Sequence, residues 1–518
     1  MKPITGRIVK IDIVRREDMI KMLIGLLLLI CGAFGCSSME EKIQPATELD
    51  LLQTIVDQNR TLTSFNSELP FEATYPFNGE STELSDQQLE RLRITENEDQ
   101  MMSKEETLED IDLLHRTWKY SYAMYSWHGG DEAFNQAHTN LTETIDQEYS
   151  DEDEITGDEL AEHLCDHYGF LTDPHVQIGG SSVVISEHDF YTTEELEFIL
   201  DENGDYWLHK SDELLDKLVA INGAPDVEDF LVPSLNNDGK LVYYLGYYTS
   251  EPVTNPWSLE FESKDDREVF VRRVGFDYLS DRSFNMYEKD EVDVVQFRNM
   301  TVYEDDSHTY EDMLESAQEL KDSPYFILDL RNNGSDNVDF VAKWYEEMFD
   351  QEAGLGEYLV QLSTTTNDVF LEETVKLYDE EGALIEQSLH HVDEDEENER
   401  REPNWYIENK DLTSIDDNDT PIFVLIDQGT SSAAERMTKQ LKQVNQVYVV
   451  GVPSAGALSS SRSLNFELPN SQIRMSVPSE FSYHPRLMEK EGVGIEPDLW
   501  IYPRFAKNRV IAWIENHY

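Results

Sequence analysis

The sequence predicts a mixed α/β protein whose core is built from parallel βα units. Ile422–Ile426 is an unbroken apolar run that ends in the polar turn Asp427–Thr430, and a helical pattern follows from Ser431. Residues 325–330 form a second apolar run, which passes through a polar turn into a helical pattern over 338–348. Continuous apolar strands of this kind are typical of parallel sheets, whose ligands gather at the carboxyl ends of the strands.

Ser432 stands in the predicted turn between strand and helix. A serine at this point has its hydroxyl pushed out of the backbone, and it lies beside unpaired N–H groups where the helix dipole favours negative charge. The alternative is an ordinary N-cap formed by Thr430 or Ser431, with Glu435 in the first turn. In the first interpretation one turn supplies a nucleophile and the turn after residue 330 supplies a backbone N–H for an oxyanion.

Four motifs occur in order along the second half of the chain: Leu328–Gly334, Gly429–Glu435, Gly451–Gly456 and Gly492–Asp498. Together they resemble the C-terminal processing (tail-specific) serine peptidases and their tricorn-like relatives. The resemblance covers Glu291–Pro503, with looser similarity back to Leu108. It implies a ClpP/crotonase-like βα core, Ser432 as nucleophile, and the N–H groups of Gly334 and Ala433 as oxyanion donors.

A serine hydroxyl needs a general base to become a nucleophile, and the sequence offers more than one candidate. The processing branch of this family uses a lysine after the glycine that matches Gly456, and this chain has Ala457 there. His175, His484 and Lys490 remain as candidates. Asp173–His175 resembles the Asp-Pro-His or Asp-Gly-His motif of the same peptidase family. In its tricorn-like branch a histidine is the base, so we prefer His175.

Glu496 belongs to the last of the four motifs. It is the residue that we expect to orient or charge-stabilise the imidazolium, as the third member of a catalytic triad does. The alternative is a solvent-facing residue before Pro497.

Residues 1–35 are predicted to be a lipoprotein signal peptide. Basic residues precede the apolar run Met22–Ile30, which is too short to span a bilayer as a finished helix and ends in small residues before Cys36. Cleavage before Cys36 and lipidation of its side chain would anchor an exported protein to a membrane of the cell envelope. A retained anchor helix is the alternative. Cys165 then has no partner, so no disulfide framework is expected.

The rest of the chain divides by composition and pattern. We predict a flexible acidic tether over 36–102, a helical domain over 103–179, a β module over 180–280, and a peptidase core over 281–518 with a solvated acidic insertion at 351–418. Lys217–Pro225 resembles the strand and turn of a PDZ-like module, which would bind a peptide along a sheet edge. A purely structural β-domain is an equal alternative.

The charge composition limits the classes of partner that the protein can bind. The 518 residues include 107 acidic and 40 basic side chains, a net charge of −67, which disfavours nucleic acid and anionic lipid surfaces as partners. We expect a peptide or protein substrate and no metal or cofactor. A peptide-binding lipoprotein without catalysis is the alternative that Ala457 and Ser335 favour, since the family commonly has glycine at the latter position. A solute-binding lipoprotein would leave the ordered motifs unexplained.

Overall fold

The computed structural model describes residues 47–60, 62, 68–77, 83–95, 101–184, 188–211, 213–276, 283–304, 306–380 and 402–518. Every described residue belongs to one compact unit, Thr47–Tyr518. The predicted signal peptide and Cys36 therefore lie outside the described residues. Within the described part of the chain, no helix is both long and apolar enough to cross a membrane.

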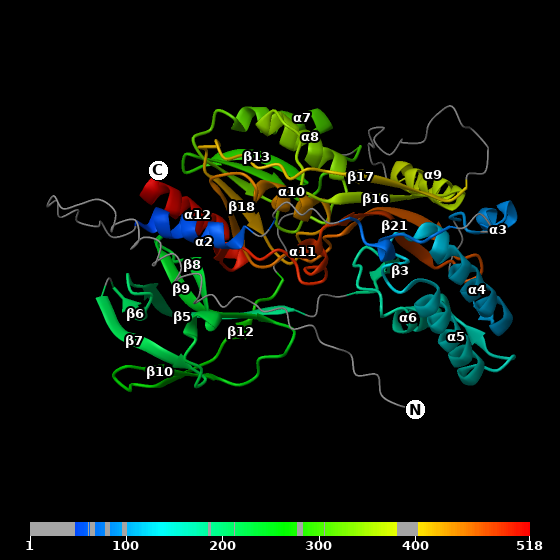
Figure 1. The fold of residues 1–518 in the computed structure, drawn as a ribbon, viewed down its shortest axis with the longest axis horizontal. Coiled ribbons are helices and arrows are strands. Elements are labelled where there is room, and N and C mark those ends of the chain that lie inside the picture. The colour runs from blue at the N-terminus through cyan, green and yellow to red at the C-terminus, as the bar shows by residue number, and fades with distance from the viewer. Residues whose placement is uncertain are drawn as a thin grey trace. The chain divides into compact units, whose positions relative to one another are not determined.

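The central sheet confirms the prediction of parallel βα units (Figure 1). Strands β15 and β18 are direct parallel neighbours, with Phe326 opposite Ile422. All neighbouring pairs in this sheet are parallel except the antiparallel edge pair β13 and β14. In spatial order the strands are β13 (Phe284–Lys289), β14 (Val292–Phe297), β15 (Phe326–Asp329), β18 (Ile422–Ile426), β19 (Val447–Gly451) and β22 (Leu499–Trp500).

Helices cover both faces of this sheet. One face packs against α7 (Tyr310–Leu320), α8 (Val338–Phe349) and α10 (Ala433–Leu441), and the other against α2 (Glu48–Asn59) and α12 (Pro503–His517). Successive strand residues point to opposite faces, so Phe326 and Leu328 join the first cluster and Ile327 joins the second. Both faces of the sheet are therefore buried, which explains its unbroken apolar runs.

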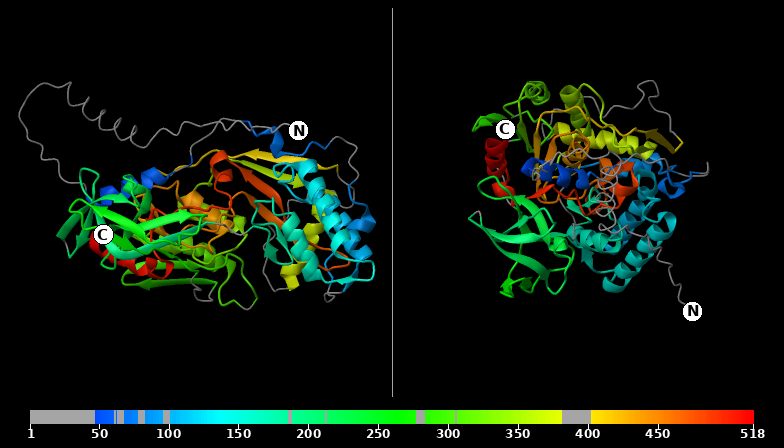
Figure 2. Two further views of the ribbon diagram at one scale, coloured as in Figure 1. Left: turned by 90° about the horizontal axis from the view of Figure 1, so that it is seen from below. Right: turned by 60° about the vertical axis from the view of Figure 1, so that its left-hand side comes forward.

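Helix α2 corrects the prediction of a flexible tether over 36–102. Leu52 and Val56 are buried in the same cluster as α12, and the Thr47 hydroxyl caps the helix. His517 Nε2 lies 3.0 Å from Glu48 Oε2, and the right-hand view of Figure 2 shows the blue helix α2 next to the red helix α12. The sequence-based prediction rested on the acidic composition of this segment and missed the helical spacing of its apolar residues. Two short elements follow α2, η1 (Phe71–Ala73) and α3 (Asp86–Arg91).

A second sheet carries the predicted helical domain. Its path is β17 (Asn404–Asn409), β16 (Tyr358–Ser363), β21 (Arg474–Tyr483), β3 (Gln177–Ile178) and β4 (Ser181–Ser182), and β20 (Ser460–Glu467) also pairs with β21. The helices packed with it are α4 (Lys104–Ser121), α5 (Gly130–Glu148), α6 (Gly157–His167) and α9 (Thr365–Glu380). The short pair β1 (Met102–Ser103) and β2 (Glu154–Ile155) and the one-turn helix α11 (Pro485–Met488) complete this half.

The predicted acidic insertion contains regular structure, because β16, α9 and β17 all fall within 351–418. Val360 and Leu362 of β16 and Phe370 of α9 are buried in the cluster of the helical domain. The prediction of a solvated loop is therefore wrong for these elements, whose apolar residues were masked by the surrounding charge. The charge run at 393–397 lies outside the described residues.

The β module is an antiparallel sheet in the order β11 (Arg267–Val269), β10 (Trp257–Phe261), β7 (Glu213–Ile221), β6 (Tyr206–Lys210), β5 (Asp189–Leu200), β9 (Leu241–Thr249), β8 (Leu231–Leu235), with β12 (Arg272–Arg273) paired to β5. In the described stretches 188–211 and 213–276 its helical content is η2 (Val227–Phe230). Its likeness to a PDZ domain stays a prediction. Arg509 of α12 ties the module to the core through two hydrogen bonds of 2.8 and 2.7 Å to Glu194.

Candidate active site

Ser432 occupies the strand-to-helix turn that the sequence predicts, as the residue before α10. Its backbone has φ 52° and ψ −117°, a conformation that costs a non-glycine residue about 1–3 kcal/mol. Two bonds between the turns hold it there: Thr430 Oγ1 donates to the Leu330 carbonyl at 3.0 Å, and the Ser431 N–H donates to the Asn333 carbonyl at 2.9 Å. The strained serine is thus presented by the joined carboxyl ends of β15 and β18.

A buried ion pair builds the first of these turns. Asp329 at the end of β15 accepts from Arg331 Nε at 2.7 Å and from Arg298 Nη2 at 3.0 Å. Burial alone would raise the pKa of the Asp329 carboxyl, but the charges and hydrogen bonds of the two guanidinium groups hold that pKa well below its usual range. The motif Leu328–Gly334 therefore carries a charged anchor that fixes the turn next to Ser432.

Glu435 in the first turn of α10 links Ser432 to the third motif. Its buried carboxylate accepts the N–H groups of Ser432 at 3.1 Å, Gly456 at 2.8 Å and Ala457 at 2.8 Å, and also the Ser454 hydroxyl. Burial raises the pKa of this carboxyl, against the opposing effect of its donors. Glu435 is therefore more than the helix-capping residue considered from sequence, because it fastens residues 454–457 to α10.

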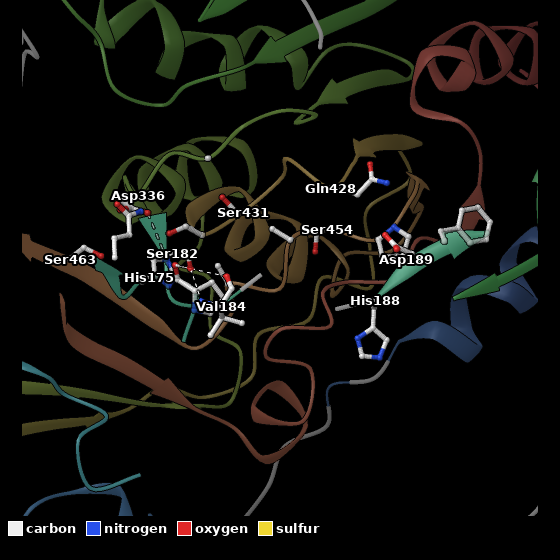
Figure 3. A pocket seen from close by; sticks show the side chains of 18 of the residues that line it. His175, Ser182, Val184, His188, Asp189, Asp336, Gln428, Ser431, Ser454 and Ser463 are labelled. Atoms are coloured by element: carbon white, nitrogen blue, oxygen red, sulfur yellow. Dashed lines mark hydrogen bonds and ion pairs between the residues drawn. The ribbon is translucent and has the colours of Figure 1, made fainter. Parts of the chain in front are cut away.

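His175 and Ser432 line one cavity of about 420 Å³, together with Gly334, Asp336 and Ala457. In Figure 3 the labelled side chains of His175 and Asp336 gather at one end of the cavity, while Gln428 and His188 lie at the other. The His175 Nε2 atom is buried and has no hydrogen-bond partner among the described residues. The structure thus brings the predicted base and nucleophile to the same space without a direct bond between them.

The other ring nitrogen of His175 is held by a serine and a carboxylate. Ser460 Oγ lies 2.6 Å from Asp173 Oδ1 and 2.8 Å from His175 Nδ1. The ionised carboxylate only accepts, so the single hydroxyl proton of Ser460 goes to Asp173, and Nδ1 must donate to Ser460. A neutral His175 therefore carries its proton on Nδ1 and leaves the Nε2 lone pair facing the cavity, as a general base requires.

The charges around His175 favour its protonated form. Burial alone lowers the pKa of His175, but the hydrogen bond with Asp173 and the negative charges of Asp336, Asp173 and Glu491 outweigh it and raise the pKa to about 9. Burial and the Asp173 charge raise the pKa of Glu491 to about 8. The site therefore stabilises the imidazolium that forms when His175 accepts a proton.

The predicted oxyanion hole is not formed in this structure. The Ala433 N–H donates to the Ser335 carbonyl at 3.0 Å, so one of the two expected donors is already occupied. Gly334 lines the cavity as expected. An oxyanion can bind the Ala433 N–H only after the Ser335 peptide has moved. The backbone geometry of this loop could not be predicted from the motif.

The structure does not bring Glu496 to His175. Its carboxylate is 45% exposed and pairs with Lys490 at 2.5 Å, which also removes Lys490 from the candidates for the base. Neither residue lines the cavity. His484 is buried at the start of α11, where its Nδ1 accepts from the Arg486 N–H at 3.2 Å, and it is not a lining residue either. Of the three candidate bases, only His175 shares the cavity with Ser432.

Sequence reasoning missed four residues of this site: Asp173, Ser460, Asp336 and Glu491. Asp173 carried a signal, since it belongs to the Asp-Pro-His motif two residues before His175. The others lie in segments far apart along the chain, without a pattern that could mark them. Among the described side chains no group of three or more His, Cys, Asp or Glu could hold a metal ion.

Comparison with known proteins relates part of the chain to a peptidase family. Residues 291–501 match the model of peptidase family S41. A search of curated protein sequences found no match. Similar solved structures include mature CPAF (14% identity, 80% of this chain and 95% of that chain, TM-score 0.40) and the photosystem II D1 C-terminal processing protease (13%, 80% and 96%, 0.34). A lipoprotein from Streptococcus agalactiae is a third (12%, 80% and 98%, 0.33). Identities and TM-scores this low support no inference about function.

Proposed function

We propose that this protein, whose residues 291–501 belong to peptidase family S41, is a serine peptidase in which Ser432 is the nucleophile and His175 the base. The observation that carries the assignment is the shared cavity, into which the unpaired Nε2 of His175 faces. Asp173 and Ser460 act as positioning residues, because they fix the ring and its tautomer without touching the substrate.

The reaction follows from these positions. His175 Nε2 takes the Ser432 hydroxyl proton as the oxygen attacks the peptide carbonyl, and the imidazolium then gives that proton to the leaving amine. Water, deprotonated by the neutral His175, next hydrolyses the acyl-enzyme and restores Ser432. The Ala433 N–H can stabilise the oxyanion in both steps once it exchanges the Ser335 carbonyl for the substrate oxygen.

A fluorophosphonate tests this assignment without knowledge of the natural substrate. We expect covalent labelling of the wild type at alkaline pH, loss of labelling in Ser432→Ala, and strong slowing in His175→Ala. Ser431→Ala is a matched control, because Ser431 lines the same cavity and the substitution removes one neighbouring hydroxyl. Labelling that survives in Ser432→Ala, or that disappears equally in Ser431→Ala, contradicts the assignment.

A second candidate function is peptide binding without catalysis. Two observations favour it: Ala457 stands where the processing branch has its lysine, and the Ala433 N–H is occupied by Ser335. The same labelling experiment decides between the two. A folded wild type that stays unlabelled from mildly acidic to strongly alkaline pH, yet binds peptides, belongs to the binding class.

We further propose that the mature chain begins at a lipid-bearing Cys36 and works as an exported protein at the cell envelope. The support is the apolar run Met22–Ile30 followed by small residues and cysteine. Two acyl chains on Cys36 would anchor the protein stably. Mass spectrometry of the mature N-terminus, with Cys36→Ser as control, tests this; a mature chain that keeps Met22–Ile30 contradicts it.

A further inference from the structure

Asp336 places a negative charge in the catalytic cavity. It follows β15 on the same turn as Gly334, and its side chain is 39% exposed. Its Oδ1 lies 3.8 Å from His175 Nε2. Among the described residues, His175 is the one basic side chain that reaches ion-pair distance of this carboxylate. When His175 is neutral, as catalysis requires, the Asp336 charge has no counter-ion of its own.

Asp189 is the other carboxylate among the described residues that line the cavity, and it has a cation of its own. Asp189, at the far end in Figure 3, pairs with Arg273 Nε at 2.6 Å. Arg462 is held by Glu480 at 3.1 Å and by Asp339 at 4.0 Å. Asp336 is therefore the lining carboxylate that has no cation of its own when His175 is neutral, and it lies at the end of the cavity that holds His175 (Figure 3).

We propose that Asp336 is a specificity-determining residue, which selects substrates with a lysine or arginine side chain next to the scissile bond. The inference rests on the proposed function, because the position of the scissile bond is set by Ser432 and His175. A substrate cation would restore the counter-ion that the cavity lacks, while an acidic side chain would meet the Asp336 charge directly.

The substrate cation has a second effect, on the base. Asp173 and Ser460 face His175 from its Nδ1 side, Asp336 faces Nε2, and Glu491 adds its charge from the loop after α11. A lysine side chain that neutralises Asp336 weakens the stabilisation of the imidazolium, so the pKa of His175 falls and more of the base is neutral. A basic substrate thus increases the fraction of neutral His175, the form that acts as the base.

Matched peptides test the proposal. Mass spectrometry of a digested peptide library first locates the scissile bond, and kcat/KM is then measured for lysine, norleucine and glutamate at each flanking position. We expect the wild type to prefer lysine over norleucine by roughly two- to fivefold at one position, the range for a partly exposed ion pair, and less at high salt. Asp336→Asn should remove the preference, and Asp336→Lys should reverse it toward glutamate.

Asp339→Asn is the matched control, because it removes an equal charge from a nearby residue at the start of α8 that does not line the cavity. It should keep the lysine preference. Fluorescence anisotropy with the same peptides in the Ser432→Ala background measures selection without catalysis. Equal binding of the lysine and norleucine peptides there, or a preference that persists in Asp336→Asn, overturns the proposal. A wild type that resists fluorophosphonate while Ser432→Ala still prefers lysine contradicts the proposed function and supports the selection by Asp336.

Discussion

Replacement of Asp173 by asparagine should produce a defect that grows with pH. Asp173 Oδ1 accepts from the backbone N–H of His175 at 3.0 Å and from Ser460 Oγ at 2.6 Å. Asp173 Oδ2 accepts from the Tyr122 hydroxyl at 3.0 Å. Because the backbone N–H needs an acceptor, the amide oxygen of the new asparagine will take the Oδ1 position. The hydrogen bonds to Ser460 and His175 are then kept, and the substitution removes mainly the charge.

The magnitude follows from the pKa of His175, which is about 9. At pH 7 about one imidazole in a hundred is then neutral, so the wild-type rate should rise roughly tenfold per pH unit and level above pH 9. If loss of the Asp173 charge lowers this pKa by about 2 units, the imidazolium loses about 2.7 kcal/mol of stabilisation. The alkaline plateau should then fall by roughly 10- to 100-fold, since a weaker base transfers the proton less readily.

At neutral pH the two effects oppose each other. The variant has a weaker base, but about half of it is already neutral at pH 7, against about one hundredth in the wild type. The rates of the two proteins should therefore agree within several-fold near pH 7 and diverge toward pH 10.

The assay is the second-order rate of fluorophosphonate labelling from pH 6 to pH 10, with Tyr122→Phe as control. That control removes one neutral donor from Asp173 and keeps its charge. It should leave the position of the pH profile nearly unchanged. A defect of equal size at every pH would show that Asp173 acts through folding alone, and no defect at alkaline pH would refute His175 as the base.

Three further variants test other contacts. Ser335→Gly should raise the labelling rate several-fold, because a more flexible peptide releases the Ala433 N–H more readily. An unchanged rate would show that the hydrogen bond from Ala433 to Ser335 does not limit the reaction. Glu496→Ala should change the free energy of unfolding by less than about 1 kcal/mol and leave labelling intact, because its ion pair with Lys490 is exposed. Loss of labelling would show that Glu496 takes part in the reaction. Leu52→Ala should lower the free energy of unfolding by about 2–5 kcal/mol in a denaturant titration, whereas a flexible tether would give no change.

Local pattern was enough to predict the parallel core and the strand-to-helix turn that holds Ser432. The apolar run before Ser432 determines a buried strand, and the polar turn after it can only lead out of the sheet. Glu496 was placed in the site by its motif alone, and spacing along the chain does not tell which way a surface side chain points. Ser460 and Asp336 became visible only in the folded structure, because their roles depend on contacts with His175, which lies far from both along the chain.

Strand β21 explains how those segments meet. It pairs with β3, where Ile178 lies opposite Met475, and with β20, where Ser460 lies opposite Phe481. One strand therefore sets the position of His175, just before β3, and of the serine that orients its ring. A slip of one residue in either pairing would turn the side chains of that strand to the other face of the sheet and separate Ser460 from Nδ1. The proposed base is thus built on the antiparallel sheet and the proposed nucleophile on the parallel one, so the proposed activity depends on how these two sheets pack together.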